Sequence, residues 1–159
     1  MKKEETIIQV ILDSGATEGH RAELVHERQV AVADLLRENR FVLKGDEAFI
    51  GPYHLHLRIA DNRLVLDVQA AEGDAQTALL IPVTPFRGII KDYRIICDSY
   101  YEAVKTAPTV RIEALDMGRR AAHNEAAEML EEFLESSVEL DFATARRLFT
   151  LLYVLHIRA

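Results

Sequence analysis

Short apolar blocks and strict alternation dominate the first half of the chain, and both patterns are typical of strands. Ile7 to Leu12 is apolar at nearly every position, which predicts a central strand covered on both faces. Three further strands are expected where apolar and polar residues alternate, from Tyr53 to Ile59, from Leu64 to Val68 and from Leu79 to Val83. Turn sequences separate these three, so we predict a three-stranded antiparallel meander beside the N-terminal strand.

Apolar residues at helical spacing mark the remaining elements. Helices are expected from about Glu23 to Asn39, from Pro85 to about Thr106, from Thr109 to about Glu135, and from Asp141 onward. Thr84 is predicted to cap the second helix and Asp141 the fourth. A loop is expected over Asp13 to Gly19, and a short strand over Val138 to Leu140.

The last predicted helix is apolar around most of its circumference, from Leu148 to Leu155. Such a helix is buried against several neighbours or offers its spare face to a second copy, so a homodimer is one of the expectations. With 159 residues, 49% of them hydrophobic, the chain is expected to fold as a single α+β domain over residues 1–159. A small, mainly antiparallel sheet would be covered by about four helices.

Charge and targeting signals narrow the classes of function. The formal net charge of -7 repels phosphate backbones, so general nucleic-acid binding is not expected. The chain shows neither a signal peptide nor a stretch that could cross a bilayer, which favours a cytoplasmic protein. The single cysteine, Cys97, falls on an apolar helical face and is expected to act as a small hydrophobic residue.

Two arginines fall where a helical projection places apolar side chains. Advancing about 100° per residue puts Arg28 between Leu35 and Val32 on one helix, and Arg119 in the apolar stripe of another. A guanidinium keeps its charge in a core, so each needs a carboxylate, a carbonyl, water or an anionic ligand. The commoner solution is an internal acid, for which the candidates are Glu27, Asp34, Asp92, Asp98 and Asp116. The alternative is a bound phosphate or carboxylate.

Further charged and titratable residues lie close to Arg119 in the sequence. Asp116, Arg120 and His123 lie three, one and four residues away from it, at spacings that let several of these side chains meet. The leading hypothesis is a non-enzymatic binding or regulatory protein that offers Arg28, Arg119, Arg120 and His123 to an anionic small molecule or an acidic protein segment. The alternatives are acid-base or phosphoryl chemistry with His123 oriented by Asp116, or a purely structural role.

The other candidate features are weaker evidence for a functional site. His54 and His56 share one face of a strand and could hold a metal only with ligands from elsewhere, so neither a metal nor another cofactor is expected. Arg146, Arg147 and Arg158 give the last helix a basic edge. Ordinary solvation explains most such charges, and the alternative is a narrow RNA contact on this edge. The sequence contains no GxxxxGK, GxGxxG or GxSxG motif.

Taken together, several short motifs resemble uncharacterised protein family 0262, a mainly alphaproteobacterial family. The motifs are His26-Glu27-Arg28, Gly51-Pro52-Tyr53, Lys91-Asp92-Tyr93, the run from Cys97 to Tyr101, Asp116-Met117-Gly118-Arg119-Arg120 with His123-Asn124-Glu125, and the run from Ala145 to Thr150. The resemblance spans nearly the whole length. It implies a small bacterial protein and brings no activity, substrate or cofactor with it.

Overall fold

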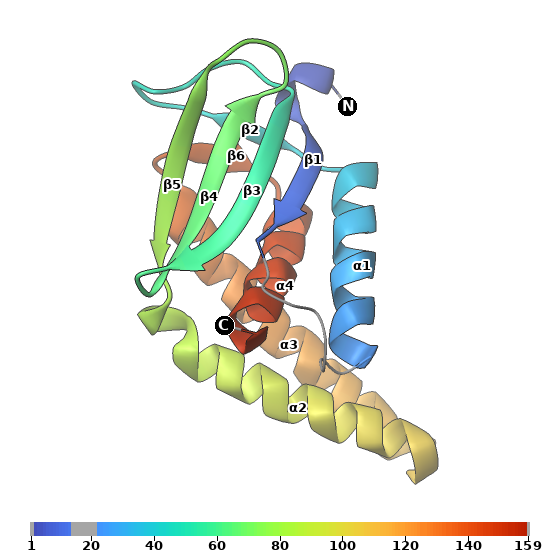
Figure 1. Ribbon diagram of the computed structural model, residues 1–159. Helices are drawn as coiled ribbons and strands as arrows, with labels where there is room; N and C mark the ends of the chain where they lie inside the picture. Colours follow the sequence, from blue (N-terminus) through green and yellow to red (C-terminus); the bar gives the residue numbers. More distant parts are fainter. Residues whose placement is uncertain (1, 14–21, 159) are drawn as a thin grey trace.

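A four-stranded sheet forms one layer of the molecule (Figure 1). The computed structural model describes residues 2–13 and 22–158. The sheet contains β1 (Ile7–Leu12), β3 (Tyr53–Ala60), β4 (Arg63–Ala70) and β5 (Gln76–Pro82) in the order β1-β3-β4-β5. The three later strands form the predicted antiparallel meander, and β1 runs parallel to β3. Most of the loop predicted over Asp13 to Gly19 lies outside the described residues.

The expectation of a central first strand is wrong, because β1 is an edge strand that pairs with β3 alone. Ile8 and Ile11 are 43% and 49% exposed, whereas Ile7 is buried. An apolar run shows that both faces of a strand are hydrophobic, but it does not show whether both are covered. A second, two-stranded sheet pairs β2 (Phe41–Leu43) with β6 (Val138–Leu140). The sequence predicted β6, but β2 was missed.

Within residues 2–13 and 22–158 the α-helices are α1 (Ala22–Arg37), α2 (Arg87–Thr106), α3 (Thr109–Leu134) and α4 (Phe142–Arg158). These helices and the mainly antiparallel sheet confirm the α+β class. Asp141 caps α4 as predicted, because its Oδ1 accepts a hydrogen bond from the backbone N–H of Thr144 at 2.9 Å. Thr84 does not cap α2. It begins a 3-10 turn (Thr84–Phe86) before that helix, and its hydroxyl oxygen accepts a hydrogen bond from Asn62.

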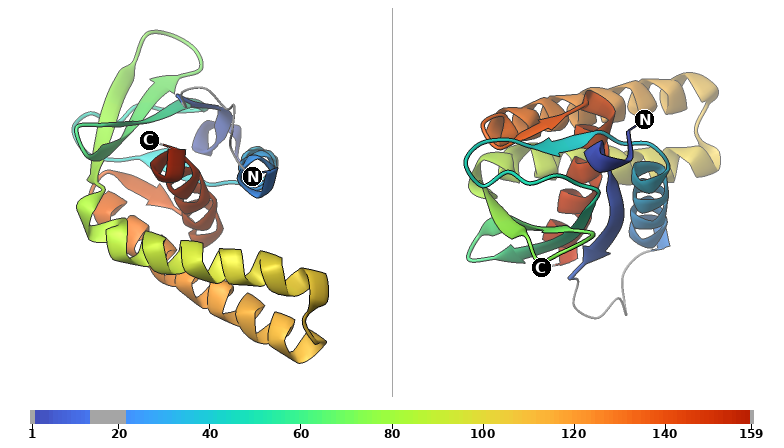
Figure 2. Two further views of the ribbon diagram at one scale, coloured as in Figure 1. Left: turned by 60° about the horizontal axis from the view of Figure 1, so that its bottom comes forward. Right: turned by 90° about the horizontal axis from the view of Figure 1, so that it is seen from above.

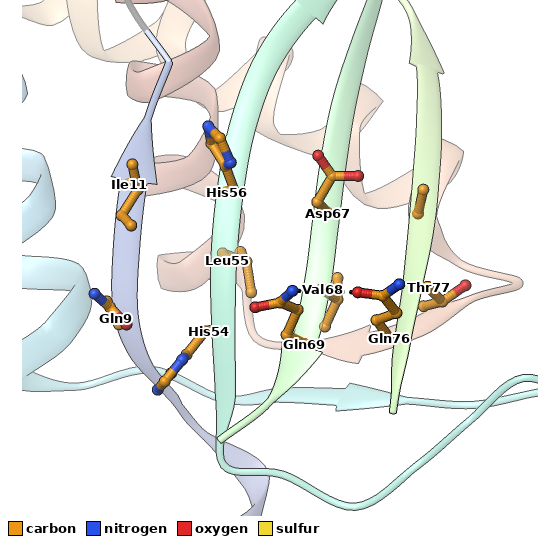
Figure 3. Close-up of a pocket in the computed structure, with 11 residues that line it drawn as sticks. Gln9, Ile11, His54, Leu55, His56, Asp67, Val68, Gln69, Gln76 and Thr77 are labelled. Carbon is orange, nitrogen blue, oxygen red and sulfur yellow. Dashed lines mark hydrogen bonds between the residues drawn. The ribbon is translucent and has the colours of Figure 1, made fainter. Parts of the chain in front are cut away.

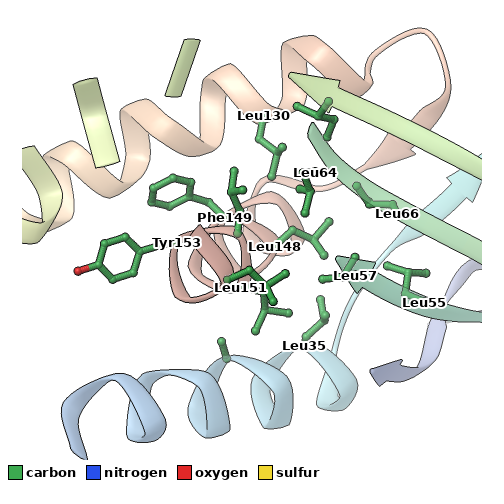
Figure 4. Close-up of a cluster of buried hydrophobic side chains, with 14 of the residues drawn as sticks. Leu35, Leu55, Leu57, Leu64, Leu66, Leu130, Leu148, Phe149, Leu151 and Tyr153 are labelled. Atoms are coloured by element: carbon green, nitrogen blue, oxygen red, sulfur yellow. The ribbon is translucent and has the colours of Figure 1, made fainter. Parts of the chain in front are cut away.

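The last helix, α4, lies at the centre of the molecule, between the sheet, α1 and α3 (Figure 2). Its apolar residues Leu148, Phe149 and Leu151 to Leu155 are each at most 4% exposed. They pack against the inner face of the sheet, where Leu57 and Leu64 lie (Figure 4). Contacts within one chain therefore bury the apolar faces of α4, so its composition does not require a dimer.

Cys97 is 1% exposed, and burial raises the pKa of its thiol to about 12, so it is the small hydrophobic residue that the sequence predicted. Among the described residues, no helix is long and apolar enough to cross a membrane.

Candidate functional site

A pocket of about 450 Å³ lies where the four helices approach one another, and we call it the four-helix pocket. It is lined by His26, Glu27, Val30, Ala31 and Asp34 of α1, Tyr93, Tyr100 and Tyr101 of α2, Arg119, Arg120 and His123 of α3, and Ala143, Arg146, Arg147 and Thr150 of α4. On both α1 and α4 most of these residues recur at intervals of three and four, so each helix turns one face to the pocket.

Arg119 is half-buried in this pocket, and a carboxylate of its own helix neutralises its charge. Its Nη2 atom lies 2.7 Å from Oδ1 of Asp116, and its guanidinium lies 4.2 Å from the centre of the Tyr100 ring. Burial works against the charge, but the hydrogen bond that Arg119 donates to Asp116 leaves the pKa of Arg119 above its usual value. The other carboxylate oxygen of Asp116 binds Arg120 at 2.9 Å. One carboxylate therefore serves two guanidinium groups.

His123 lies deeper, with 8% of its surface exposed. Its Nε2 atom lies 2.7 Å from the hydroxyl oxygen of Thr150, and its ring meets those of Tyr93 and Phe149 edge to face. Burial, with the charges of Arg146 and Arg119, lowers the pKa of His123 to about 4. The imidazole is therefore neutral near pH 7. Its Nδ1 atom is buried and has no hydrogen-bond partner among the described residues.

On the α4 side of the pocket, the arginine charges are not neutralised by carboxylates of the described residues. Arg147 donates a hydrogen bond from Nη1 to the backbone oxygen of Ala143 at 3.2 Å. The Nε atom of Arg146 is buried without a hydrogen-bond partner among the described residues, and no carboxylate within them forms an ion pair with that side chain. The sequence interpretation treated both arginines as a solvated edge. The signal that could have placed them is their spacing from Thr150, which puts all three on one helical face.

Two carboxylates face the pocket from α1. An oxygen of Glu27 accepts a hydrogen bond from the hydroxyl of Tyr93 at 3.2 Å. Asp34 binds Arg37 of its own helix at 2.7 Å. The lining therefore carries four arginines against two carboxylates, with Asp116 just behind the α3 wall. The pocket is positive towards α3 and α4 and acidic towards α1.

Arg28 does not join the other predicted site residues. It lies on the side of α1 that faces β1, in a separate surface hollow with Val10, Leu12 and Val32. Within residues 2–13 and 22–158, its guanidinium has no hydrogen-bond or ion-pair partner. The projection predicts Arg28 inside the apolar stripe, between Leu35 and Val32, and this is wrong. Leu35 is buried, but Val32 and Arg28 are only half-buried, so Arg28 lies at the edge of the buried face of α1. The structure thus brings together Asp116, Arg119, Arg120 and His123, and leaves Arg28 apart.

His54 and His56 lie on the outer face of the sheet, over a polar hollow of about 420 Å³ (Figure 3). In the strand register Gln9, His54, Gln69 and Gln76 form one row across the four strands. Asp67, the residue opposite His56, accepts a hydrogen bond from Arg58 at 3.0 Å. The described part of the chain contains no group of three side chains suited to hold a metal ion.

Comparison with known proteins adds relatives but no activity. The model of the family described as "Uncharacterised protein family (UPF0262)" matches residues 4–158. A UPF0262 protein of Sphingopyxis alaskensis is 47% identical over 154 residues, which cover 96% of this chain and 93% of the relative. UPF0262 protein amb3341 of Paramagnetospirillum magneticum is 50% identical over 137 residues, 86% of each chain. No solved structure matches this chain.

Proposed function

The chain belongs to the UPF0262 family, as its short motifs indicated, and we propose that it is a non-enzymatic binding protein whose four-helix pocket takes an anionic small molecule. The observation that carries the proposal is the convergence of Arg119, Arg120, Arg146 and Arg147 from two helices on one pocket. Guanidinium groups bind carboxylate and phosphate oxygens through paired, charge-assisted hydrogen bonds, and a pocket that excludes part of the water strengthens them.

Arg146 argues for a ligand more strongly than Arg119 does. The charge of Arg119 is already met by Asp116 and by the face of Tyr100, which is what a purely structural role requires. Arg146 has a buried Nε without a partner in the described residues, and Nδ1 of His123, which lines the same pocket, is equally unpartnered there. Buried polar atoms are nearly always hydrogen-bonded in native proteins, so a pair of exceptions in one pocket favours a missing partner.

The same geometry favours binding over acid-base catalysis. A general acid or base near pH 7 needs a pKa near that value, whereas the pKa of His123 is lowered to about 4. The catalytic alternative also needs Asp116 to orient the imidazole. The two oxygens of that carboxylate bind Arg119 and Arg120 instead, and His123 is held by Thr150.

A titration with simple anions tests the proposal. Phosphate, sulfate, phosphorylated metabolites and dicarboxylates would be added at constant ionic strength, and the melting temperature and backbone NMR shifts measured. We expect at least one anion to raise the melting temperature and to shift signals of α3 and α4. At 100 times its dissociation constant a ligand adds about 2.7 kcal/mol to stability, which is readily detected.

Matched variants make the result specific. Arg146→Gln should abolish the shift, whereas Arg111→Gln, an exposed arginine of α3 outside the pocket, should leave it unchanged. If no anion stabilises the protein, or if both variants respond as the wild type does, the proposal is wrong.

A further inference from the structure

The hydrogen bonds around Thr150 determine which nitrogen of His123 carries the hydrogen. The Thr150 hydroxyl donates to the backbone oxygen of Arg146 at 3.3 Å, and its oxygen also lies 2.7 Å from Nε2 of His123. A hydroxyl has one hydrogen to donate. Both bonds form together only if Nε2 carries the imidazole hydrogen and donates it to Thr150. Because a neutral imidazole has one N–H, Nδ1 is then a bare acceptor.

This acceptor is deeply buried, in a pocket whose α3 and α4 walls carry the donors of four arginines. His123 is 8% exposed, and its Nδ1 has no partner among the described residues. An anionic group cannot satisfy it, because two acceptors do not bond to each other. The backbone oxygen of Arg146 bonds to the same Thr150 hydroxyl that holds the ring, so the acceptor and the arginine belong to one connected cluster.

We propose that the ligand of the four-helix pocket is an anion that also carries a hydrogen-bond donor, a hydroxyl or an ammonium group, a few atoms from its charge. The anionic group lies at Arg146 and Arg147, and the donor bonds to Nδ1 of His123. The carboxylates of Glu27 and Asp34 on the α1 wall give such a ligand an electrostatic environment that a pure polyanion would not find. This inference rests on the proposed function and names the class of ligand for it.

Three phosphate monoesters of nearly equal size test the donor. 2-Hydroxyethyl phosphate carries a hydroxyl, phosphoethanolamine carries an ammonium group, and propyl phosphate carries a methyl group at the same place. Each would be titrated into the full chain at pH 7.5 and followed by NMR. We expect at least one donor-bearing ester to bind fivefold or more tightly than propyl phosphate, and the better of the two identifies the donor as hydroxyl or ammonium.

Two variants assign the effect to His123. His123→Phe keeps an aromatic ring beside Tyr93 and Phe149 but has no acceptor, so it should bind all three esters as weakly as propyl phosphate. Thr150→Val leaves the imidazole in place but frees its hydrogen to move to Nδ1, so the preference should shrink there too. This second variant keeps the test valid if His123→Phe fails to fold.

The outcomes separate the two proposals. If neither the esters nor any of the simple anions shifts the signals of the pocket, the anion site itself is refuted. If the three esters bind equally well, the anion site stands and the inferred donor is wrong. A preference that survives unchanged in both variants also overturns the inference, because the donor would then be recognised by another group.

Discussion

The Nε2 atom of His123 and the Oγ1 atom of Thr150 lie 2.7 Å apart, and this contact joins α3 to α4 at the floor of the four-helix pocket. It holds a buried imidazole between the rings of Tyr93 and Phe149. The link lies between residues 27 positions apart in the sequence, and both belong to helices that carry a pair of adjacent arginines.

Thr150→Val should destabilise the protein by about 1–3 kcal/mol. Valine has nearly the same shape, but it leaves Nε2 of the buried His123 without a hydrogen-bond partner in either tautomer, and an unsatisfied buried polar atom carries a desolvation cost of that size. Urea unfolding at pH 7.5 measures the change. Thr77→Val is a suitable control, because the Thr77 hydroxyl bonds to Glu47 at the surface and its loss should change stability by less than about 0.5 kcal/mol. Equal effects of the two variants would contradict the prediction.

Stability should depend on pH through His123 between about pH 6.5 and pH 4. The folded pKa is lowered to about 4 by burial and by Arg146 and Arg119, whereas an unfolded histidine titrates near 6.5. Above pH 6.5 the ring is neutral in both states and its contribution is complete. As the pH falls, the unfolded chain takes up a proton that the folded chain does not, and stability drops by up to about 3 kcal/mol.

Urea unfolding of the wild type and of His123→Phe at several pH values isolates this effect from the titration of carboxylates. The wild type should lose stability more steeply than the variant below pH 6.5, and the two should run parallel above it. Parallel curves over the whole range would show that the pKa of His123 is not lowered.

Asp116→Asn should strengthen the binding of inorganic phosphate. Asp116 neutralises part of the charge of Arg119 and Arg120, and its own negative charge repels an anion bound beside them. We expect removal of that repulsion to lower the dissociation constant roughly tenfold, or about 1.4 kcal/mol, which calorimetric titration measures. Asp92→Asn, an exposed change on α2, is the control and should alter binding by less than about twofold. Weaker binding by Asp116→Asn would indicate that Arg119 needs its carboxylate to stay in place.

Asn39→Ala should be among the more damaging single changes in the protein. The side chain is 3% exposed, accepts a hydrogen bond from the N–H of Ile7 at 2.7 Å, and donates to the backbone oxygens of Ile7 and Leu35 at 2.9 and 2.8 Å. It thereby ties the edge strand β1 to the end of α1. We expect a loss of about 3 kcal/mol, because buried backbone groups lose their partners. Hydrogen exchange should accelerate first in β1, and Gln9→Ala, at an exposed position of β1, should have little effect on either measurement.

Local patterns in the sequence predicted most of the fold. The four helices, the meander and the cap at Asp141 each depend on residues a few positions apart, which periodicity captures. The position of β1 in the sheet and the existence of β2 depend on distant partners. Phe41 pairs with Leu140, almost a hundred residues later, and a three-residue strand carries no periodic signal of its own.

The residues of the candidate site also divide into those placed by local spacing and those placed by contacts between distant elements. The pairs that Asp116 forms with Arg119 and Arg120 lie within one helix turn, so the sequence could place them. That Arg146 faces the same pocket, and that Arg28 faces β1 instead, depends on how the helices pack. A projection gives the angle of a side chain around its own helix, but it does not show which element of the fold packs against that side.

The central place of α4 has a consequence for biosynthesis. The ribosome makes the chain from the N-terminal end, so the leucines of the sheet and the inner sides of α1 and α3 emerge before the helix that covers them. Until residues 142–158 are released, the nascent polypeptide exposes hydrophobic surface, which promotes aggregation or chaperone binding. Premature termination just ahead of α4 should therefore yield insoluble product, even though the sheet and the other three helices would be present.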